Sequence, residues 1–153
     1  MGLIINILLR IILTVKKNLD KIKKMEKEEH INYWLKSAEH DLEVAETLFK
    51  NKKYNWCLFI SHLVLEKVLK AYFVKQYNKL PPKVHNLIRL AEIAKLELTE
   101  EQKIFLDEVN DFNLAIRYPD YKFEFYKKCT ESFTNQYFKE IKDFYKWLLY
   151  QIK

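Results

Sequence analysis

Residues 54–77, with the sequence YNWCLFISHLVLEKVLKAYFVKQY, decide the fold of this chain. Apolar side chains recur there at steps of three and four, which is the spacing of one helix face. That face consists of Cys57, Ile60, Ser61, Val64, Val68, Ala71 and Tyr72. The other side also holds Phe59, Leu63 and Phe73. A helix that is apolar on two sides is buried from two directions. We therefore predict a central helix, packed against its own core or against both that core and a partner subunit.

Four further helices are predicted from the same periodicity, over residues 31–50, 85–96, 100–116 and 129–152. Leu80-Pro81-Pro82 ends the central helix, because proline cannot continue a helix interior. Thr99 and Gln102 have the spacing of a capping box before the helix over 100–116. Residues 120–126 are expected to form an aromatic loop. The apolar face of the helix over 100–116 is expected to consist of Ile104, Phe105, Val109 and Phe112.

The fold class predicted from these elements is all-α, an up-and-down bundle of four to five helices, with an extra N-terminal helix as an option. A chain of 153 residues is long enough for one domain with a core of its own. Cys57 and Cys129 are far apart and match no zinc or redox spacing. They are expected to be buried thiols in a reducing, cytoplasmic compartment. We expect no metal site and no cofactor.

The net charge of +6 is concentrated at the N-terminus. Residues 1–24 contain six basic residues and one acidic residue, which leaves 21 basic and 20 acidic residues for the remainder. The body of the protein is therefore close to neutral and has no global basic surface of the kind that binds nucleic acid.

The first 24 residues differ from the rest in another way. Leu3 to Val15 is apolar apart from Asn6, Arg10 and Thr14, which is too short and interrupted for a transmembrane helix of about 20 apolar residues. No basic residue precedes this run, so it is a poor signal peptide. Three interpretations are open: translation from Met25, an extra packing helix and, least favoured, a basic helix on a membrane surface. We divide the chain into an N-terminal extension, 1–24, and a helical domain, 25–153.

Four groups of residues resemble those of a known family in their order along the chain. They are WLKSAEHDL at 34–42 followed by Ala45, CLFISH at 57–62, EKVLKA at 66–71, and PKVHNL at 82–87 leading to Arg117-Tyr118-Pro119. Together they resemble the HEPN domain (higher eukaryotes and prokaryotes nucleotide-binding) over about residues 31–152. The resemblance implies an α-helical bundle that is usually a homodimer. It also implies a small prokaryotic protein that works beside a minimal nucleotidyltransferase in a toxin–antitoxin pair.

Many HEPN proteins are metal-independent ribonucleases, in which an arginine is followed after four to six residues by a histidine. The imidazole handles protons and the guanidinium stabilises charge on phosphate. This chain lacks that pattern. The residues at the corresponding places are 122–124 (KFE) after Arg117, 94–96 (AKL) after Arg89 and 15–17 (VKK) after Arg10. The ribonuclease activity of the family is therefore not carried over.

Arg117 and Tyr118 are the first candidates for a ligand site, because the guanidinium fork suits an oxyanion and the ring can stack on a base. The alternative is a helix end at which Arg117 pairs with an acidic neighbour. Glu66 and Lys70 are further candidates for ligand binding, although the favoured interpretation is an ion pair along one helix, worth a few tenths of a kcal/mol. His85 is expected to cap or pack.

The leading functional hypothesis is a non-catalytic or degenerate HEPN protein that binds a nucleotidyltransferase partner, a nucleotide or RNA, or both. The rival hypothesis is a divergent ribonuclease whose site is assembled across a homodimer. Its catalytic residues would be Arg117, Glu66 and either His62 or His85. A third hypothesis is a membrane-surface or scaffolding protein that uses residues 1–24.

Overall fold

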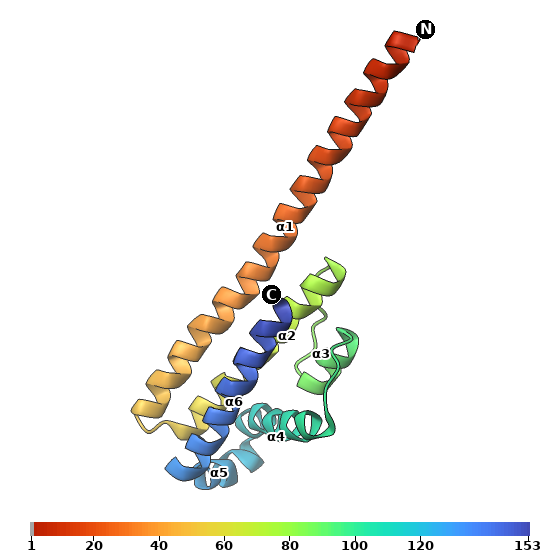
Figure 1. Ribbon diagram of the computed structural model, residues 1–153. Helices are drawn as coiled ribbons and strands as arrows, with labels where there is room; N and C mark the ends of the chain where they lie inside the picture. Colours follow the sequence, from red (N-terminus) through yellow and green to blue (C-terminus); the bar gives the residue numbers. More distant parts are fainter. Residues whose placement is uncertain (1) are drawn as a thin grey trace.

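The computed structural model describes the backbone of residues 2–153, and the side chains of that range except those of residues 2–4 and Pro119. Over this range the chain forms six helices and no strand, which confirms the predicted all-α class (Figure 1). The helices are α1 (Gly2–Lys50), α2 (Tyr54–Tyr77), α3 (Leu87–Ile93), α4 (Glu100–Arg117), α5 (Pro119–Lys128) and α6 (Glu131–Ile152).

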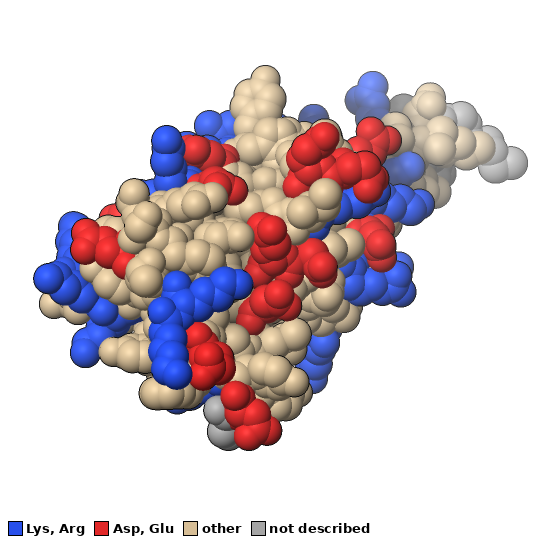
Figure 2. All heavy atoms as spheres, turned by 90° about the horizontal axis from the view of Figure 1, so that it is seen from below, with Lys and Arg blue, Asp and Glu red and all other residues tan. Residues whose placement is uncertain are grey.

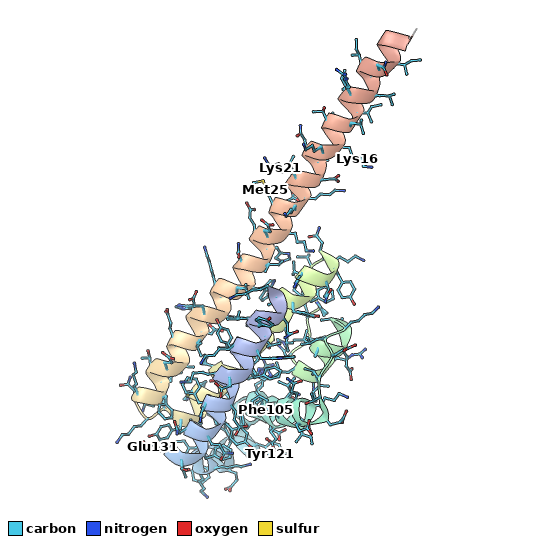
Figure 3. All side chains as sticks on the ribbon, in the orientation of Figure 1. Lys16, Lys21, Met25, Phe105, Tyr121 and Glu131 are labelled. Atoms are coloured by element: carbon cyan, nitrogen blue, oxygen red, sulfur yellow. The ribbon has the colours of Figure 1, made fainter. Side chains whose placement is uncertain are left out.

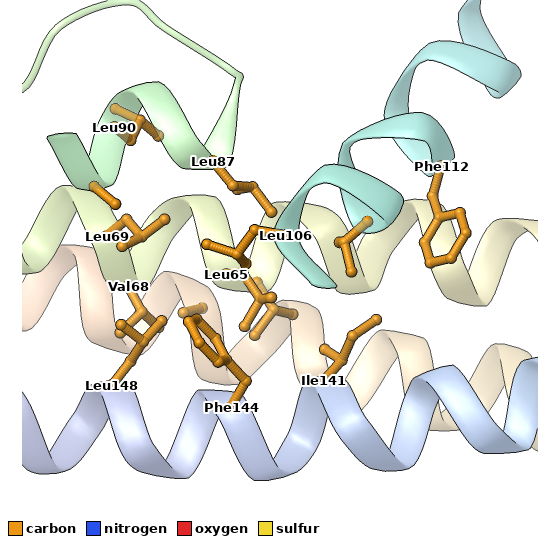
Figure 4. Close-up of a cluster of buried hydrophobic side chains, with 14 of the residues drawn as sticks. Leu65, Val68, Leu69, Leu87, Leu90, Leu106, Phe112, Ile141, Phe144 and Leu148 are labelled. Carbon is orange, nitrogen blue, oxygen red and sulfur yellow. The ribbon is translucent and has the colours of Figure 1, made fainter. Parts of the chain in front are cut away.

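Helix α2 has the predicted bounds and lies at the centre of the molecule. Fourteen of its 24 residues are buried, because other helices of the same chain cover it from several directions. In Figure 4, α3 and α4 lie on one side of α2 and α6 lies on the other, with α1 behind. Leu65 and Leu69 of α2 are fully buried in this core. The prediction of a central helix is therefore confirmed within a single chain.

The turns that bound α2 follow from their sequence. Lys52 in the short connection from α1 and Asn78 after α2 both have positive φ, at 59° and 49°. Asn78 adopts the left-handed conformation that ends many helices, and its N–H donates to the carbonyl of Val74. Thr99 and Gln102 form the predicted capping box at the start of α4. These turns let α1, α2 and α4 pack as separate elements.

The predicted aromatic loop over residues 120–126 is wrong, because this segment lies in helix α5. Tyr118 is extended, with φ −105° and ψ 116°, and ends α4. Pro119 then occupies the first turn of α5, where its missing N–H costs nothing and its fixed φ suits a helix. Here a single proline therefore marks both the end of α4 and the start of α5.

Two other details of the prediction need correction. Helix α3 spans only Leu87–Ile93, not 85–96, although Leu87 and Leu90 are buried as expected for its inner face. On α4, Ile104 was expected inside but is 63% exposed, and Leu106 is buried in its place. Residues two apart lie on nearly opposite sides of an α-helix. Because Leu106 faces α2, Ile104 faces away from it.

Helix α1 is continuous from the N-terminal extension into the domain. Its second half packs on α2, where Ala38 and Ala45 are fully buried and Asp41 forms an ion pair of 2.6 Å with Lys67. Its first half projects beyond the other helices (Figure 1). In residues 2–153 no helix is long and apolar enough to cross a membrane. The division at residue 24 coincides with no break in the helix and stays a prediction.

Both cysteines are free and buried, as expected. Burial raises the pKa of the Cys57 thiol and of the Cys129 thiol to about 12 each. A thiol with so high a pKa is almost entirely protonated at neutral pH and is therefore a poor nucleophile.

Candidate functional site

A buried carboxylate on α2, that of Glu66, organises the polar interior of the domain. Its Oε1 accepts a hydrogen bond of 2.6 Å from Lys70 Nζ, and His85 Nδ1 lies 3.1 Å from both of its oxygens. The Glu66 and Lys70 side chains are only 6% and 10% exposed. The predicted ion pair is therefore confirmed, but it is buried, whereas the free energy expected for it applies to solvated surface pairs.

His85 reaches Glu66 from the loop that joins α2 to α3. It does not cap α3, since the Asn86 side chain accepts the hydrogen bond from the Arg89 N–H. The His85 side chain is about half exposed. An ionised carboxylate only accepts hydrogen bonds, so Nδ1 of His85 donates to Glu66. The pair of Glu66 and His85 therefore fixes the orientation of one imidazole at the surface.

His62 lies one helical turn before Glu66 on α2 and is 1% exposed. Burial lowers the pKa of His62 from its usual 6.5 to about 4, although the nearby Glu66 charge opposes this. Asn113 Nδ2 of α4 lies 3.2 Å from His62 Nδ1, so the neutral ring accepts at Nδ1 and carries its proton on Nε2. The 3.9 Å contact between His62 and Glu66 is therefore not an ion pair at neutral pH.

His62 makes the stability of the fold dependent on pH. Its pKa is lower in the folded chain than in the unfolded chain, so unfolding takes up a proton between about pH 4 and 6.5. The free energy of unfolding is expected to be unaffected by this group above pH 6.5, to fall by about 3 kcal/mol toward pH 4, and to fall no further below it. Urea titrations across this range would measure the loss.

The matched control for this effect is the exposed His40. His62→Gln is expected to flatten the pH dependence of unfolding between pH 4 and 6.5, whatever its effect on stability at neutral pH. His40→Gln is expected to leave the profile unchanged. Equal profiles for the wild type and His62→Gln would contradict a neutral buried histidine.

A small polar pocket opens beside these residues. Its volume is about 80 Å³, and its lining consists of His62, His85, Asn86, Asn110, Asn113 and Leu114. Asn110 Oδ1 accepts from the Leu87 N–H at 2.9 Å, whereas its buried Nδ2 has no partner among the described residues. Two to three waters occupy a comparable volume, at about 30 Å³ each. The pocket therefore suits water or a single oxyanion group and is too small for a nucleobase.

Arg117 lies farther along the face of α4 that lines this pocket. Asn110, Asn113 and Arg117 are spaced three and four residues apart, so they share one face of the helix. Arg117 is the last residue of α4 and is exposed. In the described part of the chain it forms no hydrogen bond or ion pair, so the predicted acidic neighbour is not seen. No described contact joins Arg117 to Glu66, Lys70, His62 or His85.

A larger groove lies between α4 and α5. It has a volume of about 880 Å³ and shares Leu114 with the small pocket. The groove is lined by Asp111, Leu114, Ala115, Tyr118, Tyr121, Glu124, Phe125, Lys127 and Lys128. Tyr118 and Tyr121 are 55% and 67% exposed, and Tyr121 lies at the foot of the molecule in Figure 3. This size falls within the usual range for sites of small ligands and cofactors.

The structure thus unites four of the predicted site residues, His62, His85, Glu66 and Lys70, and places Tyr118 in the adjoining groove. Sequence reasoning missed Asn110 and Asn113. They could have been found as polar residues at the spacing of the buried stripe of α4. Both side chains are at most 6% exposed. No group of three metal-ligating side chains occurs among the described residues. On the face shown in Figure 2, basic and acidic side chains are interspersed.

A family model, that of the HEPN domain, matches residues 31–151. No curated protein and no solved structure matches the chain.

Proposed function

Since the chain belongs to the HEPN domain family, which is of a nucleotide-binding or ribonuclease type, we propose that it binds a nucleotide or RNA without cleaving it. We also propose that it acts as a homodimer beside a minimal nucleotidyltransferase, in a prokaryotic toxin–antitoxin module.

The observation that carries this proposal is the small polar pocket next to the larger aromatic groove. The pocket has the size for an oxyanion and offers the unpartnered Asn110 Nδ2 as a donor. The groove offers Tyr118 and Tyr121 as stacking surfaces for a base. Arg117, at the end of the shared helix, supplies a guanidinium fork for a phosphate. A phosphate and a base could therefore be held by two adjoining sites of different chemistry.

Binding is favoured over cleavage by the burial of His62 and by the absence of the arginine–histidine motif. His62 is 1% exposed, and burial lowers its pKa to about 4, so it is a weak base at neutral pH. No arginine is followed by a histidine at the spacing that the ribonucleases of the family use. Arg117 is thus left to stabilise charge without a neighbour in sequence that transfers protons.

A second candidate, a divergent ribonuclease, is favoured by the contact between His85 and Glu66. A carboxylate that fixes one imidazole nitrogen as donor leaves the other free to act as a base, as catalytic triads do. His85 is half exposed and is therefore accessible to a substrate. For this reading Arg117 has to reach His85, either in one subunit or from the second subunit of a dimer.

The side of α5 away from the groove supports the proposed homodimer. Phe123 and Tyr126 are 63% and 62% exposed there, and with Asn55 and Lys122 they line a depression of about 310 Å³. Aromatic side chains are enriched at protein interfaces. A contact on this side would leave the groove of Tyr118 and Tyr121 open.

Arg117→Ala is expected to weaken the binding of AMP and of a labelled single-stranded RNA by about 10- to 100-fold, because a hydrogen bond from a charged group is worth about 1.5–3 kcal/mol. Fluorescence titration would measure the change. The matched control is Arg89→Ala, since Arg89 is exposed on α3 and, among the described residues, pairs with Glu92 alone.

RNA integrity separates the two candidates. We expect total RNA and tRNA to stay intact over hours with the wild-type protein. If the wild-type protein cleaves RNA and both Arg117→Ala and His85→Ala abolish the cleavage, the protein is a ribonuclease and the proposal of binding without cleavage is wrong. Equal affinity of the Arg117→Ala and Arg89→Ala variants would remove Arg117 from the site.

A further inference from the structure

The first half of α1 carries large apolar side chains that no described part of the chain covers. Each of them is between 50% and 64% exposed, and they continue from residue 5 to residue 25. They are Ile5, Ile7, Leu8, Leu9, Ile11, Ile12, Leu13, Val15, Leu19, Ile22 and Met25. Figure 3 shows this half of α1 extending beyond the bundle, with side chains directed outward all round. So large an apolar surface on one helix marks an interaction site.

The distribution of polar residues around the helix describes the partner. In residues 5–15 the polar side chains are Asn6, Arg10 and Thr14, which are four apart and form one narrow stripe. The apolar residues occupy the rest of the circumference. A two-stranded coiled coil would cover only a seam such as Leu8, Ile12 and Val15. It would leave Leu9 and Leu13 in water, whereas a lipid phase can cover them all.

Apart from Arg10, the charges lie at one end of this apolar segment. Lysines follow it directly, at positions 16, 17, 21, 23 and 24, with Asp20 as the one acidic residue among them. Figure 3 shows Lys16 and Lys21 pointing to different sides of the helix. Two copies of this segment side by side in parallel would bring like charges together, whereas an anionic surface would attract them. Long lysine side chains can keep the ammonium group at a lipid headgroup while their stems lie in apolar surroundings.

The length of the segment suits one leaflet. Eleven helical residues, 5–15, span about 16 Å at 1.5 Å per residue, roughly half of the 30 Å hydrocarbon core of a bilayer. This agrees with the finding that no described helix could cross a membrane.

We propose that residues 5–25 of α1 dock the protein on an anionic lipid surface, with the apolar residues 5–15 in one leaflet and the lysines of 16–24 at the headgroups. This proposal is independent of nucleotide or RNA binding by the domain, because the two sites lie on different parts of the molecule. The docked helix would hold the bundle at a fixed distance from the membrane.

The test is co-sedimentation of the full chain with vesicles. One set of vesicles consists of phosphatidylcholine alone, and the other contains phosphatidylglycerol in addition. We expect binding to the anionic set and at least tenfold weaker binding to the neutral set. Ile12→Glu is expected to weaken binding to anionic vesicles by about 10- to 100-fold, because it places a charge where the docked helix puts an apolar side chain in lipid. Thr14→Glu introduces the same charge two residues from Lys16, at the headgroup end of the segment, and should weaken binding much less.

The lysines are tested separately. The double variant Lys16→Gln/Lys17→Gln is expected to lose about tenfold or more in affinity for anionic vesicles, since each lysine near such a surface is worth about fivefold. Added salt should have the same effect. Equal binding of Ile12→Glu and Thr14→Glu, or equal binding to both vesicle sets, would overturn the proposal. The proposal would also be overturned if the protein does not bind vesicles but forms an oligomer, and Ile12→Glu dissociates that oligomer.

Discussion

Glu66→Ala is expected to lower the free energy of unfolding by about 3–5 kcal/mol, because it leaves the ammonium of Lys70 buried without its counterion. Lys70 Nζ lies 2.6 Å from Glu66 Oε1, and the centroid of the Trp34 ring lies 5.2 Å from the same Nζ. A cation–π contact of this kind is worth far less than the lost ion pair. His85 loses its hydrogen-bond acceptor as well. Urea unfolding followed by far-UV circular dichroism would measure the change.

The double variant Glu66→Leu/Lys70→Met distinguishes charge burial from packing. Replacing both members of a buried ion pair by apolar residues of similar volume is often neutral for stability, so this protein should unfold within about 1 kcal/mol of the wild type. It is expected to lose the orientation of His85, and with it any binding that depends on the small pocket.

The matched surface control is Glu92→Ala, which removes the partner of Arg89 in an ion pair whose side chains are 64% and 58% exposed. Its effect should stay below about 1 kcal/mol. A loss of that same small size for Glu66→Ala would show that water reaches Lys70 and that the site is not a closed interior.

Leu65→Ala is expected to cost about 2–5 kcal/mol, through lost burial and the cavity left behind. Leu65 is fully buried at the centre of α2, among residues of α4 and α6 (Figure 4). The surrounding side chains belong to different helices, so no single one can shift to fill the space without disturbing another contact. The same urea titration measures the loss.

Leu80→Ala makes the identical chemical change at a position that is 81% exposed, after the end of α2. It should change stability by less than about 0.5 kcal/mol. If the two variants were equally stable, α2 would not be the core of the domain.

Much of the helix pattern could be predicted because it depends on local signals. The bounds of α2 and the capping box of Thr99 and Gln102 each follow from a few consecutive residues. The error at α5 has the same origin, since proline is a signal both for the end of one helix and for the start of the next. The error at Ile104 differs in kind, because the direction in which α4 faces α2 is decided by packing over the whole molecule.

The candidate site was predicted in part. Glu66 and Lys70 were recognisable as a pair because they are four residues apart on one helix. The convergence of His85 on the same carboxylate was not, because 19 residues separate His85 from Glu66 in the chain. The contact of Asn113 with His62 spans 51 residues. Spacing along one helix carries no information about partners on another element.

By itself, the sequence determined the all-α class, the central helix and membership of the HEPN family, since helical periodicity and the order of short motifs are local properties of the chain. Only the tertiary structure decided that Glu66 is buried, so that its ion pair with Lys70 lies in the interior and not on the surface. It also brought His85 to the same carboxylate. It alone decided that His62 is neutral and that the apolar half of α1 stays uncovered. Burial depends on which distant segments meet, and that physical quantity is absent from any single stretch of sequence.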